Sequence, residues 1–486
     1  MGNTLKEKTI SGFKWSFLDN VGKVGGQFVI GIILTRLLSP ADFGLVGMLT
    51  IFIVIGQALT NSGFGQALVQ KKDADLTDFS TVFYFNILAS TFIYFIIYVC
   101  SPYIASFYNE PQLVLLTKVI CLNFVINAFG LIQIVYLEKA LDFKAPSIIG
   151  IVSVFVSGAV SIVLAYKDFG VWALVVNTVL RSLITTVLLW FVSKWRPVLI
   201  FSKKSLATMF SYGSKILLAG LLQSVFRNIY YLIIGRVFEA KSLGYYTRAA
   251  QFTELPVNTL TTVIQKVTFP VFSSIQNDTV KIVDGYTKVY RLLAFAALPL
   301  MAFIYITSEP LIEIVLGEKW LPVVPYLKLM CVYSWLYVFF AINNQIITIK
   351  GRSDFYLRIQ IIDKVFIVLA ILLTYKYGIS ALIYGHMIAT VLTFFVGCYF
   401  LKKIIAITLY SQLRNIFPFF VASLFMLIAG ILLSKVITNN IQYLLACFTA
   451  APGIYILLLW LFKVEELNHG FNQAKEYLKK LKRQKL

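Results

Sequence analysis

The stretch SGFKWSFLDNVGKVGGQFVIGIILTRLL, Ser11–Leu38, is long and apolar enough to cross a lipid bilayer, which takes roughly 20 residues. Its first half nevertheless carries a stripe of polar side chains at helical spacing, namely Ser16, Asp19, Asn20, Lys23 and Gln27. A charge at membrane depth costs at least ~2.5 kcal/mol on insertion scales, so we expect the stripe to face protein or a water-filled cavity. Lys14, nearer to the start, fits the headgroup boundary equally well.

The composition indicates a protein that crosses the membrane many times. Of its 486 residues 59% are hydrophobic and 13% are charged, whereas a soluble protein carries about 25% charged residues. The five cysteines show no paired spacing and fall in or beside apolar runs, so we expect free thiols in the core. Only two histidines occur, His386 and His469, which argues against a histidine-rich metal centre, and we expect no metal site.

Hydropathy windows of about 19 residues predict an all-α polytopic protein with about fourteen spans. The predicted spans are 12–37, 42–68, 79–102, 113–137, 145–166, 170–193, 207–237, 245–272, 286–308, 322–349, 356–376, 379–401, 413–435 and 441–463. The connectors are short and alternate between basic and sparsely basic, and the basic ones mark the cytoplasmic side. This alternation places both termini in the cytoplasm.

An internal repeat predicts the domain organisation. TRLLSPADFGLVGM (Thr35–Met48) aligns with GRVFEAKSLGYYTR (Gly235–Arg248) 200 positions later, and GVWAL from Gly170 aligns with GISAL from Gly378. We predict two six-helix lobes, at residues 1–194 and 206–404, joined by a linker at residues 195–205. Two additional helices at residues 405–463 and a basic tail at residues 464–486 follow. Each lobe holds an even number of spans, so both copies share one orientation and the substrate site is expected between them.

Polar stripes recur on the first two spans of each predicted lobe. The predicted lining of a polar cavity is Asp19, Asn20, Gln57, Asn61, Gln223, Gln251, Glu254 and Asn258. Basic residues in the spans outnumber the acids, which are mainly Asp19, Glu254 and Asp363. Helices held together by ion pairs would show balanced charges, so the excess of cations predicts an anionic substrate.

Some ionisable residues allow two interpretations. Asp363 fits either a proton- or cation-coupling site or a local ion pair with Lys364 or Arg358, and Asp19 is a second candidate for coupling. His386, flanked by glycine in YGHMIA, fits a packing or hydrogen-bonding role or a proton relay.

The sequence argues against several other functions. It has no GxxxxGK[ST] motif, so we expect no nucleotide hydrolysis. The acidic pair in DAD, Asp73–Asp75, resembles a metal-binding motif, but it stands beside Lys71 in a predicted cytoplasmic loop. A glycan polymerase or ligase should carry a sizeable exterior loop with catalytic residues, and none is evident. The chain is therefore expected not to be an enzyme.

The opening GFKWSFLDNVGKVGGQFVIGIILTRLLSPADFGLVGM and its continuation TNSGFGQALVQKKD, residues 60–73, resemble the Wzx-type polysaccharide flippases. These export O-antigen, capsule or colanic-acid-like glycans and belong to the MOP superfamily, with the MATE drug exporters and the lipid II flippases. The resemblance implies a V-shaped bundle that alternates between inward- and outward-open states. It also implies transport of an undecaprenyl-pyrophosphate-linked oligosaccharide from the cytoplasmic to the periplasmic leaflet of a bacterial inner membrane.

The resemblance further implies a cationic cavity for the pyrophosphate. Its residues here would be Lys14, Lys23, Arg181, Lys215, Arg227 and Lys266. A coupling site for H⁺ or Na⁺ would correspond to Asp363 with Thr390 or Thr393, and no other cofactor is expected. The implied partners are the lipid-linked oligosaccharide, membrane lipids, and a polysaccharide polymerase with other assembly proteins, but no nucleic acid. The rival function is a cation-coupled exporter of small molecules, for which acidic residues should dominate the cavity.

Overall fold

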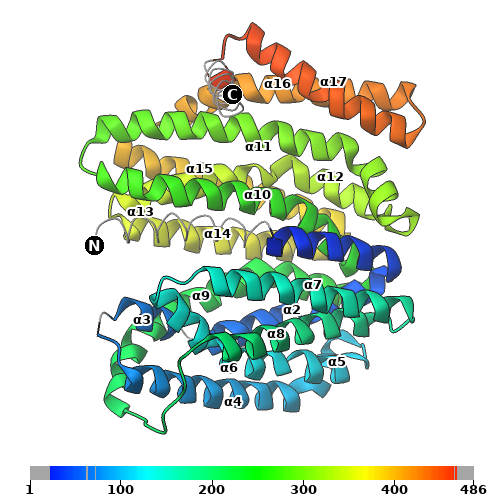
Figure 1. Ribbon diagram of the computed structural model, residues 1–486. Helices are drawn as coiled ribbons and strands as arrows, with labels where there is room; N and C mark the ends of the chain where they lie inside the picture. The colour runs from blue at the N-terminus through cyan, green and yellow to red at the C-terminus, as the bar shows by residue number, and fades with distance from the viewer. Residues whose placement is uncertain (1–21, 62–63, 72, 465, 468–486) are drawn as a thin grey trace, which may run out of the picture. The chain divides into compact units, whose positions relative to one another are not determined.

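The computed structural model describes residues 22–61, 64–71, 73–464 and 466–467, and these contain helices but no strand (Figure 1). Residues 22–37 are helical. The first half of the chain then contains α2 (Pro40–Asn61), α3 (Phe64–Gln70), α4 (Leu76–Tyr108), α5 (Leu113–Ile120), α6 (Leu122–Lys139), α7 (Lys144–Tyr166), α8 (Val171–Val192) and α9 (Lys203–Val237). The second contains α10 (Ala240–Ser274), α11 (Thr279–Leu316), η1 (Glu318–Trp320), α12 (Val323–Ser334), α13 (Leu336–Ile349), α14 (Ser353–Thr374), η2 (Tyr375–Tyr377), α15 (Ile379–Ile405), α16 (Leu409–Val436) and α17 (Asn440–Leu461).

Each predicted span overlaps a helix or a closely linked helix pair, which confirms the all-helical membrane fold. Ten helical stretches in the described part of the chain are long and apolar enough to cross a bilayer. Two of these stretches, Leu113–Lys139 and Val323–Ile349, each contain a break, at Cys121 and Trp335 respectively. The count of fourteen spans stays a prediction, because the helix over 22–37, α9, α10 and α14 are not among these ten stretches.

The chain divides into two compact units, Met1–Thr247 (unit 1) and Arg248–Leu486 (unit 2). The division falls within α10. The lobe boundaries expected from the repeat, with a linker at 195–205, stay predictions.

In unit 1 the two copies of the repeat contact one another through glycines. A Cβ atom built on Gly44 would lie 1.7 Å from the carbonyl oxygen of Ala240, and one built on Gly244 would lie 1.9 Å from that of Pro40. Because backbone atoms occupy the space of a side chain, only glycine permits this approach. Pro40 and Ala240 are themselves 200 positions apart, so the contact is reciprocal.

The helix over residues 22–37 packs closely on α7 at small residues. A Cβ atom built on Gly158 would lie 2.2 Å from Cδ1 of Ile30, and one on Gly26 would lie 3.2 Å from Cγ1 of Val154. Small residues on both helices let the backbones come together, as in many membrane helix pairs.

The segment between α8 and α9 is fixed to α4. The amide of Val198 donates to Oγ of Ser80 at 3.0 Å, and the amide of Ser202 donates to Oγ1 of Thr81 at 3.0 Å. Trp195 is buried in an apolar cluster whose other members include Phe79 and Phe83. Asp75 caps α4 by accepting from the amide of Asp78 at 2.8 Å, so this residue of the DAD motif has a structural role.

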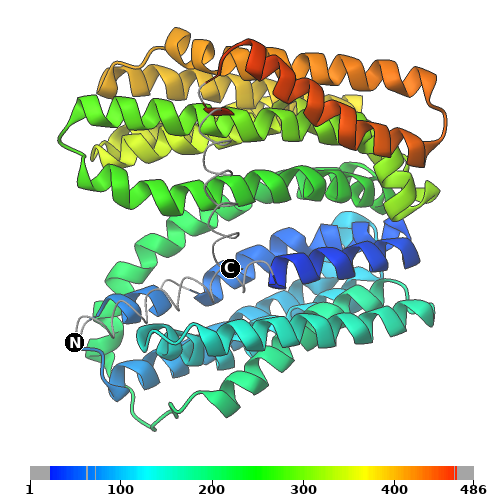
Figure 2. The same cartoon turned by 45° about the horizontal axis from the view of Figure 1, so that its top comes forward.

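In unit 2, α11, α16 and α17 pack side by side (Figures 1 and 2). A neutral polar network joins α11, α13 and α16: Tyr286 donates to Oδ1 of Asn343 at 2.6 Å, and both Asn343 and Tyr290 donate to Oε1 of Gln412. All four side chains are buried. Arg291 of α11 makes a two-pronged ion pair with Glu466, which follows α17. These contacts hold α16 against α11 and α13, and hold the segment after α17 against α11.

Candidate functional site

Two members of the polar stripe of the first predicted span, Lys23 and Gln27, are among the described residues, and the side chain of Gln27 is exposed. The side chain of Lys23 is partly buried and lies over Gly150 of α7, where an added Cβ atom would come 2.3 Å from the lysine Nζ. The glycine therefore leaves room for the ammonium group against the helix backbone. Lys14, Asp19 and Asn20 lie outside the described residues, and their predicted roles stay predictions.

The other predicted site residues of unit 1 lie on α2, α8 and α9. Gln57 on α2 and Arg181 on α8 are partly buried, whereas Gln223 and Arg227 on α9 are exposed. The side chains of Asn61 and Lys215 are outside the described part. A charged residue on a membrane helix favours water or protein over lipid, so the exposed side chain of Arg227 is suited to line a water-filled cavity. That these residues share one cavity stays a prediction.

In unit 2 the predicted polar face of α10 is exposed along much of its length. Glu254, Asn258 and Lys266 are exposed, and Gln251 is partly buried. Gln251 Oε1 accepts a hydrogen bond from Arg248 Nη1 at 2.6 Å. α10 therefore exposes charges of both signs, the carboxylate of Glu254 and the ammonium group of Lys266.

Asp363 and Thr390 belong to a polar cluster between α14 and α15. Asp363 Oδ2 forms an ion pair with Lys364 Nζ at 2.7 Å, and Asp363 Oδ1 accepts from Thr393 Oγ1 at 3.0 Å. The ion-pair interpretation of Asp363 with Lys364 is thereby confirmed. The two side chains are 17% and 26% exposed, so the pair is shielded from solvent on most sides.

His386 extends this cluster to α12 and α13. Its Nε2 lies 2.8 Å from the hydroxyl of Tyr337, and its Nδ1 lies 3.4 Å from that of Tyr333. Tyr337 also contacts Oγ1 of Thr390 at 3.2 Å. The hydrogen-bonding role expected for His386 is confirmed.

The two tyrosines were missed in the sequence, although they stand four residues apart and could share a helix face. Membrane proteins carry many interfacial tyrosines, so this spacing has little weight by itself.

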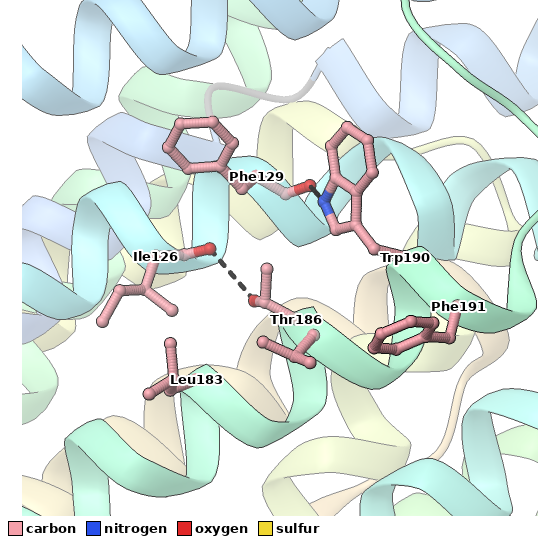
Figure 3. Close-up of a pocket in the computed structure, with 7 residues that line it drawn as sticks. Ile126, Phe129, Leu183, Thr186, Trp190 and Phe191 are labelled. Carbon is pink, nitrogen blue, oxygen red and sulfur yellow. Dashed lines mark hydrogen bonds between the residues drawn. The ribbon is translucent and has the colours of Figure 1, made fainter.

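A groove of about 360 Å³ lies between α6 and α8 of unit 1 (Figure 3). It is lined by Ile126, Phe129, Leu183, Thr186, Val187, Trp190 and Phe191. The polar atoms of two lining residues turn to the backbone: Thr186 Oγ1 donates to the carbonyl of Ile126 at 3.0 Å and Trp190 Nε1 to that of Phe129 at 2.9 Å. Because the hydroxyl of Thr186 and the indole N–H of Trp190 are already hydrogen-bonded, the groove is better suited to a hydrocarbon chain than to a sugar.

The described residues contain no group of three or more His, Cys, Asp and Glu side chains that could hold a metal ion. The five cysteines are free, as expected. Acid–base chemistry on a bound sugar would require ionisable groups converging on a cleft. The cluster around Asp363 instead satisfies its groups internally, which favours a structural or ion-coupling role.

Comparison with solved structures identifies the fold. The structure entitled "Lipid II flippase MurJ, inward closed conformation" has a TM-score of 0.76 and 14% identity, with 94% of this chain and 100% of that chain covered. An inward-facing MATE-family multidrug resistance transporter of the MOP superfamily has a TM-score of 0.62 and 15% identity, with 78% and 95% covered. The chain therefore has the helical architecture of MOP-superfamily transporters.

Sequence comparison identifies the family. Teichuronic acid biosynthesis protein TuaB of Bacillus subtilis is 29% identical, with 94% of this chain and 96% of that protein covered. Lipopolysaccharide biosynthesis protein WzxC of Escherichia coli is 26% identical, with 72% of each chain covered. The profile of the family described as "Polysaccharide biosynthesis protein" matches residues 33–325, more than half of the chain. This chain belongs to the polysaccharide biosynthesis protein family.

Proposed function

We propose that the protein is a flippase that moves an undecaprenyl-pyrophosphate-linked oligosaccharide from the cytoplasmic to the periplasmic leaflet of a bacterial inner membrane. The observation that carries this proposal is the family match over residues 33–325. Two relatives are named for the biosynthesis of teichuronic acid and of lipopolysaccharide, and the likeness to a lipid II flippase supplies a suitable fold. The protein changes no covalent bond in its cargo, and both termini lie in the cytoplasm.

The pyrophosphate binds to cations on the polar helices. Lys23 lies on the helix over 22–37, Arg227 on α9 and Lys266 on α10, and the two last are exposed. Arg181 and, outside the described side chains, Lys14 and Lys215 complete the set. A cation that meets phosphate in a low-dielectric site forms a stronger contact than in water. The uncharged cavity residues, such as Gln57, Gln223 and Asn258, hydrogen-bond the glycan.

Two rocking lobes give the cargo alternating access to the two leaflets. The polyprenyl tail stays in the hydrocarbon of the bilayer throughout, so only the headgroup needs a polar path. The protein delivers its cargo to a polysaccharide polymerase and other assembly proteins on the periplasmic side. Transport is coupled to H⁺ or Na⁺ through the cluster of Asp363 and Thr390, with Asp19 as a second candidate.

The test is a complementation experiment in a strain that depends on this gene for its surface polysaccharide. Lys23→Ala combined with Arg227→Ala should lower surface polysaccharide at least tenfold, because two phosphate contacts are lost. Mass spectrometry should then detect the lipid-linked glycan accumulating in the membrane. Lys435→Ala, which removes an exposed cation at the end of α16, is the matched control and should export normally. Normal export by the double variant at normal abundance would refute the docking site.

A further inference from the structure

The apolar groove between α6 and α8 is open along one side of α8. Leu183, Val187 and Phe191 line it at intervals of four residues, so they share one face of the helix, and all three are exposed (Figure 3). The stretch from Leu183 to Phe191 is about 12 Å long at a rise of 1.5 Å per residue. One leaflet contributes roughly 15 Å of hydrocarbon, half the thickness of the bilayer core. The groove is therefore about as long as one leaflet is deep.

Two cations follow the groove in the chain. α8 ends at Val192, and the next basic residues are Lys194 and Arg196, both of which are exposed. The guanidinium carbon of Arg196 lies 5.5 Å from the ring centroid of Trp190, which lines the groove. Within the part of the chain that the structure describes, neither Lys194 nor Arg196 forms an ion pair. One end of the groove thus carries positive charge that no described carboxylate balances.

Arg196 also caps the end of α8, but the cap uses only part of its hydrogen-bonding capacity. Its Nη1 donates to the carbonyls of Ser193 and Trp195, at 2.6 and 2.8 Å, and its Nη2 donates to that of Trp190 at 2.8 Å. A guanidinium has five N–H groups, so one on Nε and one on Nη2 are left without an acceptor among the described residues. Arg291 of unit 2 holds a carboxylate through these same two nitrogens. A phosphate group is bound by arginine in the same way.

The segment between α8 and α9 indicates where the membrane surface lies. Residues 198–201 are apolar and exposed, and the side chain of Leu199 is 92% exposed. Their backbone is nevertheless held against α4 by the hydrogen bonds of Val198 and Ser202 (Figure 1). Apolar side chains held outward between basic residues are typical of a segment that lies in the membrane interface. Arg196, in the same segment, then stands at the depth of the lipid phosphates.

We propose that the groove and its two cations form a binding site for an anionic phospholipid. One acyl chain lies along α8 from Phe191 to Leu183, and the phosphate contacts Arg196 and Lys194. The inference goes beyond the proposed transport and takes from it only the orientation, which places the basic connector and hence this lipid on the cytoplasmic side.

The negative charge of the headgroup follows from the local excess of cations. A zwitterionic lipid such as phosphatidylcholine also has a phosphate, but its choline cation would be repelled by Lys194 and Arg196. A basic residue near a membrane surface favours anionic lipid by an amount that corresponds to about fivefold in affinity. The site should therefore distinguish two lipids that have identical chains and different headgroups.

The dimensions of the groove favour an acyl chain over the polyprenyl tail of the proposed cargo. An acyl chain ends within its own leaflet, and the groove has a matching length. A polyprenyl tail is much longer and has a methyl branch on every isoprene unit. Its pyrophosphate also carries more negative charge than a phosphodiester, whereas three N–H groups of Arg196 are already used by α8.

The headgroup is tested by native mass spectrometry of the delipidated full-length protein with dioleoyl phosphatidylglycerol or dioleoyl phosphatidylcholine. The first phosphatidylglycerol should bind at least fivefold more tightly than the first phosphatidylcholine. Lys194→Glu, which leaves the cap of α8 untouched, should weaken phosphatidylglycerol binding at least fivefold. Lys203→Glu makes the same change of charge on an exposed residue at the start of α9, and should bind this lipid like the wild type. Equal affinity for the two lipids, or equal losses in the two variants, would overturn the inference.

The groove is tested by filling it. Val187→Trp places a large side chain in the groove and should weaken the binding of both lipids at least fivefold. Val163→Trp is the matched control, because Val163 is an exposed valine of α7 outside the groove, and it should leave binding unchanged. Thermal unfolding in detergent should give the same Tm for both variants, since both valines are exposed. Unchanged lipid binding in Val187→Trp would overturn the inference.

A competition experiment separates the two sources of a phosphorylated lipid. Undecaprenyl phosphate, added to the protein with phosphatidylglycerol bound, should not displace it. Displacement that Val187→Trp abolishes would assign the groove to the tail of the cargo and overturn the phospholipid site. Each of these results leaves the proposed transport standing, because surface polysaccharide in the complementation experiment tests that function separately.

Discussion

The α7–α8 hairpin of unit 1 and the α14–α15 hairpin of unit 2 hold equivalent positions in the predicted repeat, yet they are built from different side chains. Both turns end at a glycine with positive φ, Gly170 at 53° and Gly378 at 99°, directly before the second helix. In the first hairpin buried Ser161 donates to the backbone carbonyl of Ala173 at 2.5 Å. In the second, Thr393 donates to a carboxylate, Asp363, which also holds an ammonium group.

The difference indicates that the two hairpins have different roles. α7 buries serines whose hydroxyls bond the backbone, and its Gly158 receives the helix over 22–37. Such contacts hold helices at a fixed distance and carry no charge that could change. α14 and α15 instead enclose a carboxylate with its ammonium partner, and the imidazole of His386 lies nearby on α15. One hairpin therefore serves as a packing surface, and the other holds the charged residues for which we propose ion coupling.

The largest effect is expected from Lys364→Met in the α14–α15 hairpin. Removing one partner of a shielded ion pair leaves Asp363 without its counter-charge, which should lower the free energy of unfolding by about 3 kcal/mol. Thermal unfolding in detergent should show this loss. Sodium chloride, compared with choline chloride, should then raise the Tm of the variant but not that of the wild type, because the vacated carboxylate can take a metal cation. The double change Asp363→Asn with Lys364→Met should recover most of the loss and show no sodium effect.

A smaller effect is expected from Gly158→Leu in α7. The added side chain would overlap Ile30 and would have to push the helix over 22–37 away from α7. This should lower the free energy of unfolding by about 2 kcal/mol. Gly25→Leu is the matched control, since a Cβ atom there has no neighbour within 4 Å. Thermal unfolding of the two variants measures the difference. Equal losses would show that the close packing on α7 contributes nothing specific to stability.

The smallest effect is expected from Ser161→Ala. The change removes one neutral hydrogen bond to a backbone carbonyl, which should cost about 1 kcal/mol and should not depend on pH or salt. Thermal unfolding at several pH values tests both statements. A loss that grew with acidity would mean that the α7–α8 hairpin also contains a titrating group, and the contrast between the hairpins would fail.

Much of the fold could be predicted from the sequence, because long apolar runs have few alternatives to a membrane helix. The repeat marked Gly44 and Gly244, but a pattern alone could not tell that both lie at one contact. The ion pair of Asp363 with Lys364 was predictable as an alternative, since the residues are neighbours in the chain.

The tyrosines of the candidate site could not be singled out from the sequence. Nothing in the pattern distinguishes Tyr333 and Tyr337 among 27 tyrosines, because their role depends on the approach of α15, which brings His386 to them. The cationic cavity stays a prediction for another reason. Lys14, Asp19 and Asn20 lie outside the described residues, and the pattern of a polar stripe does not say which side chains meet across a cavity.

The glycine contact in unit 1 has the geometry of an isologous interface, in which residue i of one copy touches residue j of the other and j touches i. Gly44 meets Ala240 while Gly244 meets Pro40, and these four positions form two pairs under the repeat. A side chain at either glycine pushes the same two helix starts apart. The costs of replacing Gly44 and Gly244 therefore do not add, because the first replacement already opens the space that the second requires.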